Sequence, residues 1–131
     1  MRLNILVSPT WSTCLAGGHW VQTQLLTQNP SANLRVYAGW WPMLWNDSRE
    51  MWNGTHMADP RVMPYWDCDR VIGQGFAKQV DGYEGIAWDS YYLYGPNARW
   101  DTVPSPLLDS GGTIYGEREN PGIQIRILLE K

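Results

Sequence analysis

The stretch ILVSPTWSTC, residues 5–14, decides the fold, because strand-forming residues lead directly into a tryptophan and a cysteine. Residues 3–8, LNILVS, form a short apolar run before a proline, which is typical of a buried strand. Residues 14–28 then place Cys14 and further apolar or small side chains at helical spacing, with glutamines between them. A strand, a loop containing Trp11 and a helix follow one another, which is how a βαβ unit begins.

The alternation of strands and helices continues along the chain. Residues 34–41, LRVYAGWW, are rich in strand formers and predict a second strand. Residues 61–66, RVMPYW, predict a third strand, and Pro64 assigns it to an edge or a bulge. The pattern is weak between these strands, over residues 46–59, where Ser48 is suited to cap a short helix.

The second half of the chain predicts one more helix and a hairpin. Asp67 is a good N-cap for a helix over residues 68–80. Residues 86–100 contain Gly-Pro-Asn between two strand-like runs, which predicts a hairpin. Residues 101–112 have the composition of a loop. Residues 123–129 alternate with period two and predict an edge strand, with a short C-terminal helix as the alternative.

This order of elements predicts an α/β domain: a central mixed sheet flanked by helices, with a closing β-hairpin. The 131 residues are long enough for one domain with a proper core, so we expect a single domain over residues 1–131. Residues 3–8 are apolar throughout and should lie inside the sheet. Gly17 and Gly18 lie within the first helix, where they would allow close packing on the sheet.

Composition excludes several classes of function. A net charge of -3 and a pI near 5.2 argue against a nucleic-acid partner, which requires a basic face. No apolar run approaches the ~20 residues that span a bilayer. The first residues lack a signal-peptide pattern, so we expect a cytoplasmic protein, in which two cysteines normally stay reduced.

Tryptophan is the most unusual feature of the composition. The chain has nine tryptophans beside seven tyrosines and one phenylalanine. They either fill the core or form an aromatic surface for a partner, since tryptophan is enriched at binding hot spots. Trp40 and Trp41 are adjacent, so their side chains point to opposite faces of a strand, and at least one is expected at the carboxyl edge of the sheet rather than in the core. The predicted aromatic edge consists of Trp11, Trp40, Trp41, Trp45 and Trp66.

The opening stretch resembles the thioredoxin family. In that family a central strand leads to W-C-x-x-C, and the second cysteine lies in the first turn of the following helix. Here Ser12-Thr13-Cys14 matches the x-x-C half, and Trp11 occupies the place of the nucleophilic cysteine. Residues 87–100, AWDSYYLYGPNARW, resemble the late hairpin of the family, but Gly85-Ile86 stands where a cis-proline is normal. The resemblance covers the element order of residues 3–100.

The missing cysteine changes the chemistry that the resemblance implies. Thiol–disulfide exchange needs a reactive thiolate and a second thiol that resolves the mixed disulfide. Cys14 alone is either a small buried hydrophobic residue or a monothiol. Its only possible intramolecular partner is Cys68, which follows the third predicted strand and so reaches the same sheet edge. The two thiols approach each other if the first and third strands are neighbours.

Other chemistry-bearing residues carry weaker signals. His19 and His56 could join the two cysteines in a zinc site, but no ligand spacing supports one, and we expect neither metal nor cofactor. Asp89 lies in an apolar stretch and resembles a buried, hydrogen-bonded carboxylate rather than a catalytic base.

We therefore expect a thioredoxin-like binding or accessory module, not an enzyme, that engages a protein partner at its aromatic edge through Trp11, Ser12, Thr13, Trp40, Trp41, Trp45 and Trp66. The first alternative is a redox protein that uses Cys14 as a monothiol or paired with Cys68. The second is a binder of small molecules or sugars through its tryptophans.

Overall fold

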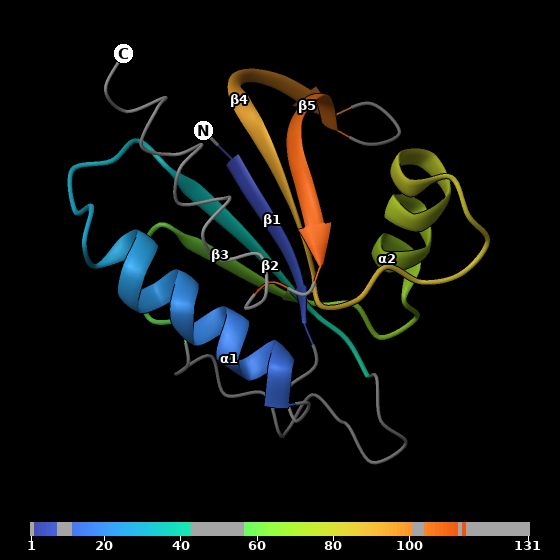
Figure 1. Cartoon of the computed structure of the whole chain (residues 1–131), viewed down its shortest axis with the longest axis horizontal. Helices are drawn as coiled ribbons and strands as arrows, with labels where there is room; N and C mark the ends of the chain where they lie inside the picture. Colours follow the sequence, from blue (N-terminus) through green and yellow to red (C-terminus); the bar gives the residue numbers. More distant parts are fainter. Residues whose placement is uncertain (1, 8–11, 43–56, 101–103, 113, 115–131) are drawn as a thin grey trace.

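A five-stranded mixed sheet forms the centre of the protein. The computed structural model describes residues 2–7, 12–42, 57–100, 104–112 and 114. The sheet order is β3-β2-β1-β4-β5, with β1, β2 and β3 parallel and β4 and β5 antiparallel (Figure 1). The expected mixed sheet, with the first strand at its centre, is therefore confirmed. The strands are β1 (Arg2–Val7), β2 (Arg35–Trp40), β3 (Val62–Trp66), β4 (Ser90–Trp100) and β5 (Pro104–Gly112).

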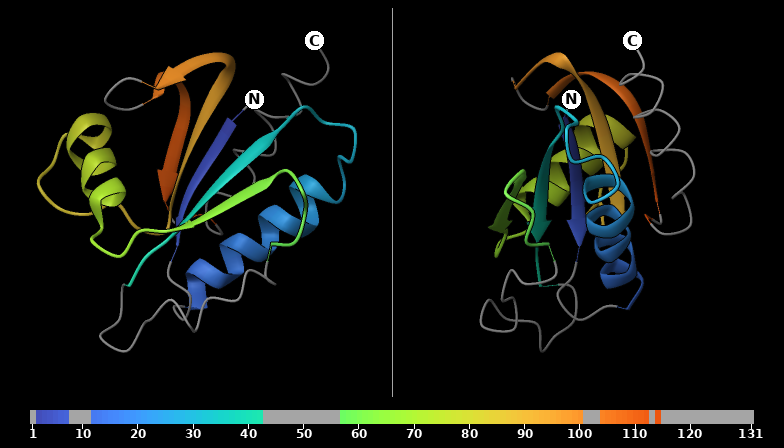
Figure 2. Two further views of the ribbon diagram at one scale, coloured as in Figure 1. Left: turned by 180° about the vertical axis from the view of Figure 1, so that it is seen from behind. Right: turned by 90° about the vertical axis from the view of Figure 1, so that its left-hand side faces the viewer.

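Two helices cover opposite faces of this sheet (Figure 2). The first is α1 (Ser12–Trp20), which continues as the wider turns of η1 (Val21–Leu26). The second is α2 (Val71–Phe76), which continues as η3 (Ala77–Asp81). The alternation of side chains along β4 separates the two cores, since Tyr91 and Leu93 pack with the core on the α1 side, whereas Tyr92 and Tyr94 pack with α2.

The larger core lies between α1 and the sheet. The helix contributes the face predicted by its spacing, including Cys14, Val21 and Leu25, and all three are buried. Residues of the three parallel strands and β4 fill the other side, and they are Leu3, Ile5, Val36, Ala38, Trp40, Val62, Tyr91 and Leu93. The helix ends before Asn29, whose side-chain amide donates a hydrogen bond to the Leu25 carbonyl.

Gly17 lets α1 approach the C-terminal part of the described chain. A Cβ at this position would lie 2.7 Å from the Cβ of Ile114, which is fully buried. A Cβ at Gly18 would lie 3.6 Å from the Met57 sulfur, which is an ordinary contact. The close-packing role predicted for this glycine pair is confirmed for Gly17 and wrong for Gly18.

Alanine substitutions at these two glycines should therefore change stability in opposite directions. Gly18→Ala is expected to gain about 0.5–1 kcal/mol from helix propensity alone. Gly17→Ala gains the same term but adds an overpacking cost of about 1–3 kcal/mol, so its net effect is a loss of about 1 kcal/mol. Denaturant unfolding of both variants measures the difference, and equal effects would contradict the close contact with Ile114.

Aromatic rings and one carboxylate make up the smaller core under α2. The Phe76 and Tyr92 rings stack with centroids 4.3 Å apart, and the Tyr92 hydroxyl donates a 2.7 Å hydrogen bond to Asp81. The Tyr94 hydroxyl is buried and has no hydrogen-bond partner in the described part of the chain. Burial, reinforced by the negative charge of Asp81, raises the pKa of Tyr94 to about 12. Burial and then the hydrogen bond to Asp81 also raise the pKa of Tyr92.

Substituting phenylalanine for Tyr92 and, separately, for Tyr94 should show that the two hydroxyls contribute differently to the free energy of unfolding. Tyr92→Phe removes a charge-assisted hydrogen bond and is expected to cost about 1–2 kcal/mol, whereas Tyr94→Phe removes an unpaired buried hydroxyl and is expected to be neutral or stabilising. Because both tyrosines favour the neutral phenol in the folded state, their contribution is complete below the unfolded pKa of about 10 and is lost as pH rises above it. Unfolding measurements at neutral and alkaline pH test both points. A larger loss for Tyr94→Phe than for Tyr92→Phe would contradict the assignment.

The outer side of β3 is poor in hydrogen-bond donors. The N–H of Val36 bonds to the Arg61 carbonyl and the N–H of Asp67 bonds to the Trp40 carbonyl, so residues 61, 63, 65 and 67 face β2. Residues 62, 64 and 66 therefore face outward. The N–H of Val62 already bonds to the Asp59 carbonyl, and Pro64 has none. The predicted edge position of Pro64 is confirmed.

Arg61 joins the start of β3 to the end of the first helix. Its guanidinium forms a bidentate ion pair with Asp59, with distances of 3.0 Å from Nε and 2.8 Å from Nη2. The same group donates hydrogen bonds to the carbonyl oxygens of Leu26, Asn29 and Ala32. One side chain thus ties together three carbonyls of the segment from the end of η1 to Ala32, each of which also accepts a backbone N–H.

Two predictions for the second half are wrong. Gly95-Pro96-Asn97 does not form a turn, because β4 runs through it and pairs with β5, so the loop predicted for residues 101–112 is mostly strand. Pro96 is tolerated because β1 pairs with β4 only as far as Tyr94, and because the pairing with β5 is irregular between Tyr94 and Arg99. The closing hairpin exists, but it consists of β4 and β5. The predicted C-terminal strand over residues 123–129 and the short helix near Ser48 lie outside the described residues.

Candidate functional site

The carboxyl ends of β1, β2 and β3 meet at one edge of the sheet, because these three strands are parallel. Ligands of open α/β sheets bind outside this edge. Trp40 and Trp66 are register partners at the ends of β2 and β3, so two of the predicted binding residues are brought together. Ser12 and Thr13 begin α1, which follows β1. Trp11 and Trp45 lie outside the described residues.

Trp40 and Trp41 are more buried than a binding edge requires. Trp40 is 1% exposed and belongs to the large core, so the prediction of an open ring is wrong for this residue. Trp41 lies directly after β2, at the edge and outside both core clusters, but it is only 4% exposed. Its indole N–H has no hydrogen-bond partner within the described part of the chain. Trp66 is half-buried and is the most accessible of the three.

Asp67 positions the segment between β3 and α2. It is buried, and its carboxylate accepts hydrogen bonds from the backbone N–H groups of Val71 and Ile72 at 2.9 Å and of Gly73 at 3.4 Å. The predicted capping role is confirmed, although the helix begins at Val71 rather than at residue 68. Val71, the first residue of this helix, is 63% exposed, although its spacing from the other apolar residues of the helix would suit the inner face. Burial, and then the negative charge of Asp67, raises the pKa of Tyr65 on β3.

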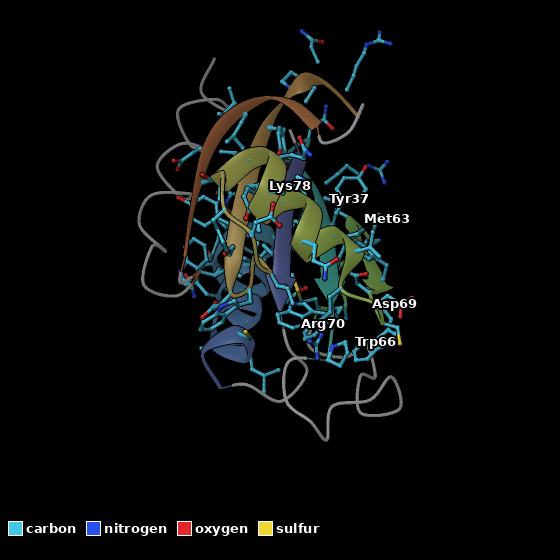
Figure 3. All side chains as sticks on the ribbon, turned by 90° about the vertical axis from the view of Figure 1, so that its right-hand side faces the viewer. Tyr37, Met63, Trp66, Asp69, Arg70 and Lys78 are labelled. Carbon is cyan, nitrogen blue, oxygen red and sulfur yellow. The ribbon has the colours of Figure 1, made fainter. Side chains whose placement is uncertain are left out.

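Arg70 closes the turn that Asp67 begins. Its backbone has a φ of 60°, in the left-handed region, and its N–H bonds to the Asp67 carbonyl at 3.1 Å. The guanidinium carbon lies 5.5 Å from the Trp41 ring centroid, and Nε donates a 3.1 Å hydrogen bond to the Pro42 carbonyl. Figure 3 shows Arg70 at the same end of the sheet as Trp66 and Asp69, with Tyr37 and Met63 further along the strands. This side chain bridges β2 and α2 at the site.

Sequence reasoning missed Arg70 as a site residue. A left-handed conformation in a residue other than glycine leaves no local sequence pattern. The sequence signal that could have identified Arg70 is Asp67. A carboxylate that caps a helix starting a few residues later fixes the turn in between, and Arg70 lies in that turn. Its partner Trp41 was among the predicted edge tryptophans, but nothing in the sequence paired it with Arg70.

The two cysteines are at this edge but are not placed as a redox pair. Both are thiols rather than halves of a disulfide, Cys14 is fully buried in the α1 core, and Cys68 is exposed. The strands that precede them are separated by β2, so the condition for their approach is not met. Strands two places apart are ~10 Å from each other, whereas a disulfide requires Cα atoms within ~7 Å.

Asp89 precedes β4 and lies beside the end of β1, since Ser90 pairs with Leu6. It is 1% exposed, and its Oδ1 accepts a hydrogen bond from the N–H of Ile114 at 3.2 Å. The expectation of a buried, hydrogen-bonded carboxylate is confirmed. Its φ of 46° marks the position just before the strand as unusual. β4 begins at Ser90, so the residue directly before this strand is Asp89 and not the Gly85-Ile86 pair expected from the sequence.

The described helices include none that is long and apolar enough to cross a membrane. In the same part of the chain, no group of three or more His, Cys, Asp or Glu side chains could hold a metal ion. Comparisons with protein-family models, curated proteins and solved structures find no match to this chain.

Proposed function

We propose that this protein is a thioredoxin-like binding module that engages a protein partner at the carboxyl edge of its parallel strands. The contact surface consists of Trp66, Arg70 and Val71 at this edge, together with Met63, which is exposed further along β3, and we call it the edge surface. It replaces the predicted surface of tryptophans, of which Trp40 and Trp41 are buried, with more accessible residues.

The element order supports the thioredoxin-like part of this proposal. β1 is central, α1 follows it with Cys14 in the first turn, and β4 with β5 forms a closing hairpin. The position before β4, where the family has a cis-proline, is occupied by Asp89 with its unusual backbone. With Trp11 in place of the nucleophilic cysteine, this arrangement offers a scaffold without the local dithiol.

The composition of the edge surface carries the binding part. Met63 is 48% exposed and Val71 63% exposed, although both are apolar. Val71 directly follows half-buried Arg70, whereas Met63 lies on the other face of β3 from half-buried Trp66, which packs against the core on the α1 side. Methionine, aromatic residues and arginine are the side chains enriched in protein interfaces. A sugar or small-molecule binder is less well supported, because Trp40 and Trp41 offer no open ring face.

Redox function has one favourable observation, which is that the Cys68 thiol is exposed. However, the buried Cys14 has no access to a substrate disulfide without local opening. We therefore rank redox chemistry second.

A capture experiment with matched variants tests the proposal. The tagged protein and the double variant Met63→Asp/Val71→Asp are incubated with an extract of the native cells. The control is Leu107→Asp/Leu108→Asp on β5, where both leucines are also exposed, at 39% and 44%. We expect one protein to bind stoichiometrically to the wild type and the control, and at least about tenfold less to the edge-surface variant, since hot-spot losses reach ~2 kcal/mol or more.

The competing function is measured on the same preparations by insulin reduction. We expect no turnover in the wild type or in Cys68→Ser. Rapid turnover that disappears in Cys68→Ser would replace the binding proposal with the redox alternative. Equal capture by the two double variants would remove the edge surface from it.

A further inference from the structure

Arg70 carries a positive charge that its surroundings hold in place but do not neutralise. Its side chain is fixed by the Pro42 carbonyl and by the Trp41 ring. Among the described residues, the ion pair present is that of Arg61 with Asp59, and no carboxylate lies within ion-pair distance of Arg70. A half-buried guanidinium that is oriented but lacks an anionic partner is prepared to receive one.

The acidic residues on either side of Arg70 do not serve as that partner. Both oxygens of Asp67 accept backbone hydrogen bonds from Val71, Ile72 and Gly73. This also means that the N–H groups at the start of α2 are occupied, so the helix end itself is not an anion site. Asp69 is exposed and forms no ion pair among the described residues. The donors that remain at this position are the Nη1 and Nη2 groups of Arg70.

We propose that Arg70 is the receptor for an oxyanion, supplied by a carboxylate or phosphate group on the partner protein. The source of the oxyanion rests on the proposed function, but the site itself does not. With Nε bonded to Pro42, the two Nη groups can donate to two oxygens of one carboxylate or phosphate. The guanidinium lies over the Trp41 ring, and this cation–π contact, with the Nε bond to Pro42, holds the group in place for two-point recognition.

The backbone of Arg70 supports the proposal independently. Its left-handed conformation, at φ 60°, is uncommon for an arginine and brings the side chain back over β2 instead of along α2. Such residues persist where the surrounding structure determines them, and they cluster at ligand-binding positions. Asp67 holds Arg70 in this conformation, because its carbonyl accepts the Arg70 N–H and its carboxylate accepts the Val71 N–H.

Titration of the ¹⁵N-labelled full chain with small anions tests the site without a partner. Acetate and inorganic phosphate are added at constant ionic strength, with chloride as the reference, and the signals of the Arg70 Nε–H and the Trp41 indole N–H are followed. We expect a saturable shift with acetate or phosphate, and the stronger of the two identifies the source. Arg70→Lys should bind about tenfold more weakly, because the two-point geometry is lost while the charge stays.

Arg99 on β4 is an exposed arginine of the described chain and is the matched control. Arg99→Lys should leave the titration unchanged. Shifts at Arg70 that do not saturate, shifts that match those at Arg99, or a Trp41 indole shift that saturates at the same anion concentration in Arg70→Lys as in the wild type would overturn the proposal and assign Arg70 to structure alone. Those results would leave the capture experiment untouched, so failure of this site and failure of the proposed function are separable.

Discussion

Asp67→Ala is expected to lower the free energy of unfolding by about 3 kcal/mol, because it removes the acceptor of three backbone N–H groups in a buried place. A single lost N-cap costs ~1 kcal/mol, and bonds to a charged acceptor are about twice as strong as neutral ones. With a typical stability of ~5–15 kcal/mol, this one side chain accounts for a large share. Denaturant unfolding measures the loss.

Asp69→Ala is the control for this prediction, since Asp69 is exposed two residues later in the same turn. Its effect should stay within about 0.5 kcal/mol. Amide exchange adds a local measure, because Val71 and Ile72 should exchange much faster in Asp67→Ala alone. Equal losses from the two alanines would show that Asp67 does not hold α2 in place.

Arg61→Met is expected to cost about 3 kcal/mol. Removing one member of a buried ion pair costs ~3–5 kcal/mol, and we take the lower end because the Arg61 and Asp59 side chains are still 18% and 13% exposed. The variant also removes the guanidinium hydrogen bonds to the carbonyls of Leu26, Asn29 and Ala32, each of which keeps one backbone N–H donor. Arg35→Met, at an exposed arginine on β2, is the matched control and should change stability by less than about 0.5 kcal/mol.

The same pair predicts a pH dependence. The hydrogen bond from Arg61 holds the pKa of Asp59 below its ordinary value. A lowered carboxyl pKa stabilises the fold above the unfolded pKa of about 4 and loses that contribution as pH falls through the folded pKa. The difference in unfolding free energy between wild type and Arg61→Met should therefore shrink on acidification. A difference that stays constant with pH would contradict the ion pair.

The sequence predicted the elements whose pattern is local. Residues 3–8 predicted a buried strand because four of the six are aliphatic and a proline follows them. The helix after Cys14 was predicted because its inner positions recur at helical spacing. Pro64 marked an edge because proline lacks a donor. Each of these patterns lies within a short stretch of sequence and does not depend on which elements pack together.

The failures lie where tertiary context decides. Gly-Pro-Asn is a turn signal, but here the strand passes through it as an irregularity in the pairing with β5, at a point where β1 no longer pairs with β4. Val71 fits the inner face by spacing, yet Gly73, Phe76 and Ala77 form that face, because Asp67 sets where the helix begins. At the site, adjacent tryptophans suggested an open aromatic edge, but one fills the core and the other lies under Arg70.

The outer side of β3 has a consequence for how copies of this protein meet. Of the three outward residues of β3, Val62 has its N–H occupied and Pro64 has none. If the β3 strands of two copies lay edge to edge, most of the facing backbone groups would therefore be carbonyls without a donor. Such a pairing is repulsive and cannot grow into a continuous sheet. β3 can therefore expose Met63 to a partner protein without pairing edge to edge with a second copy of this chain.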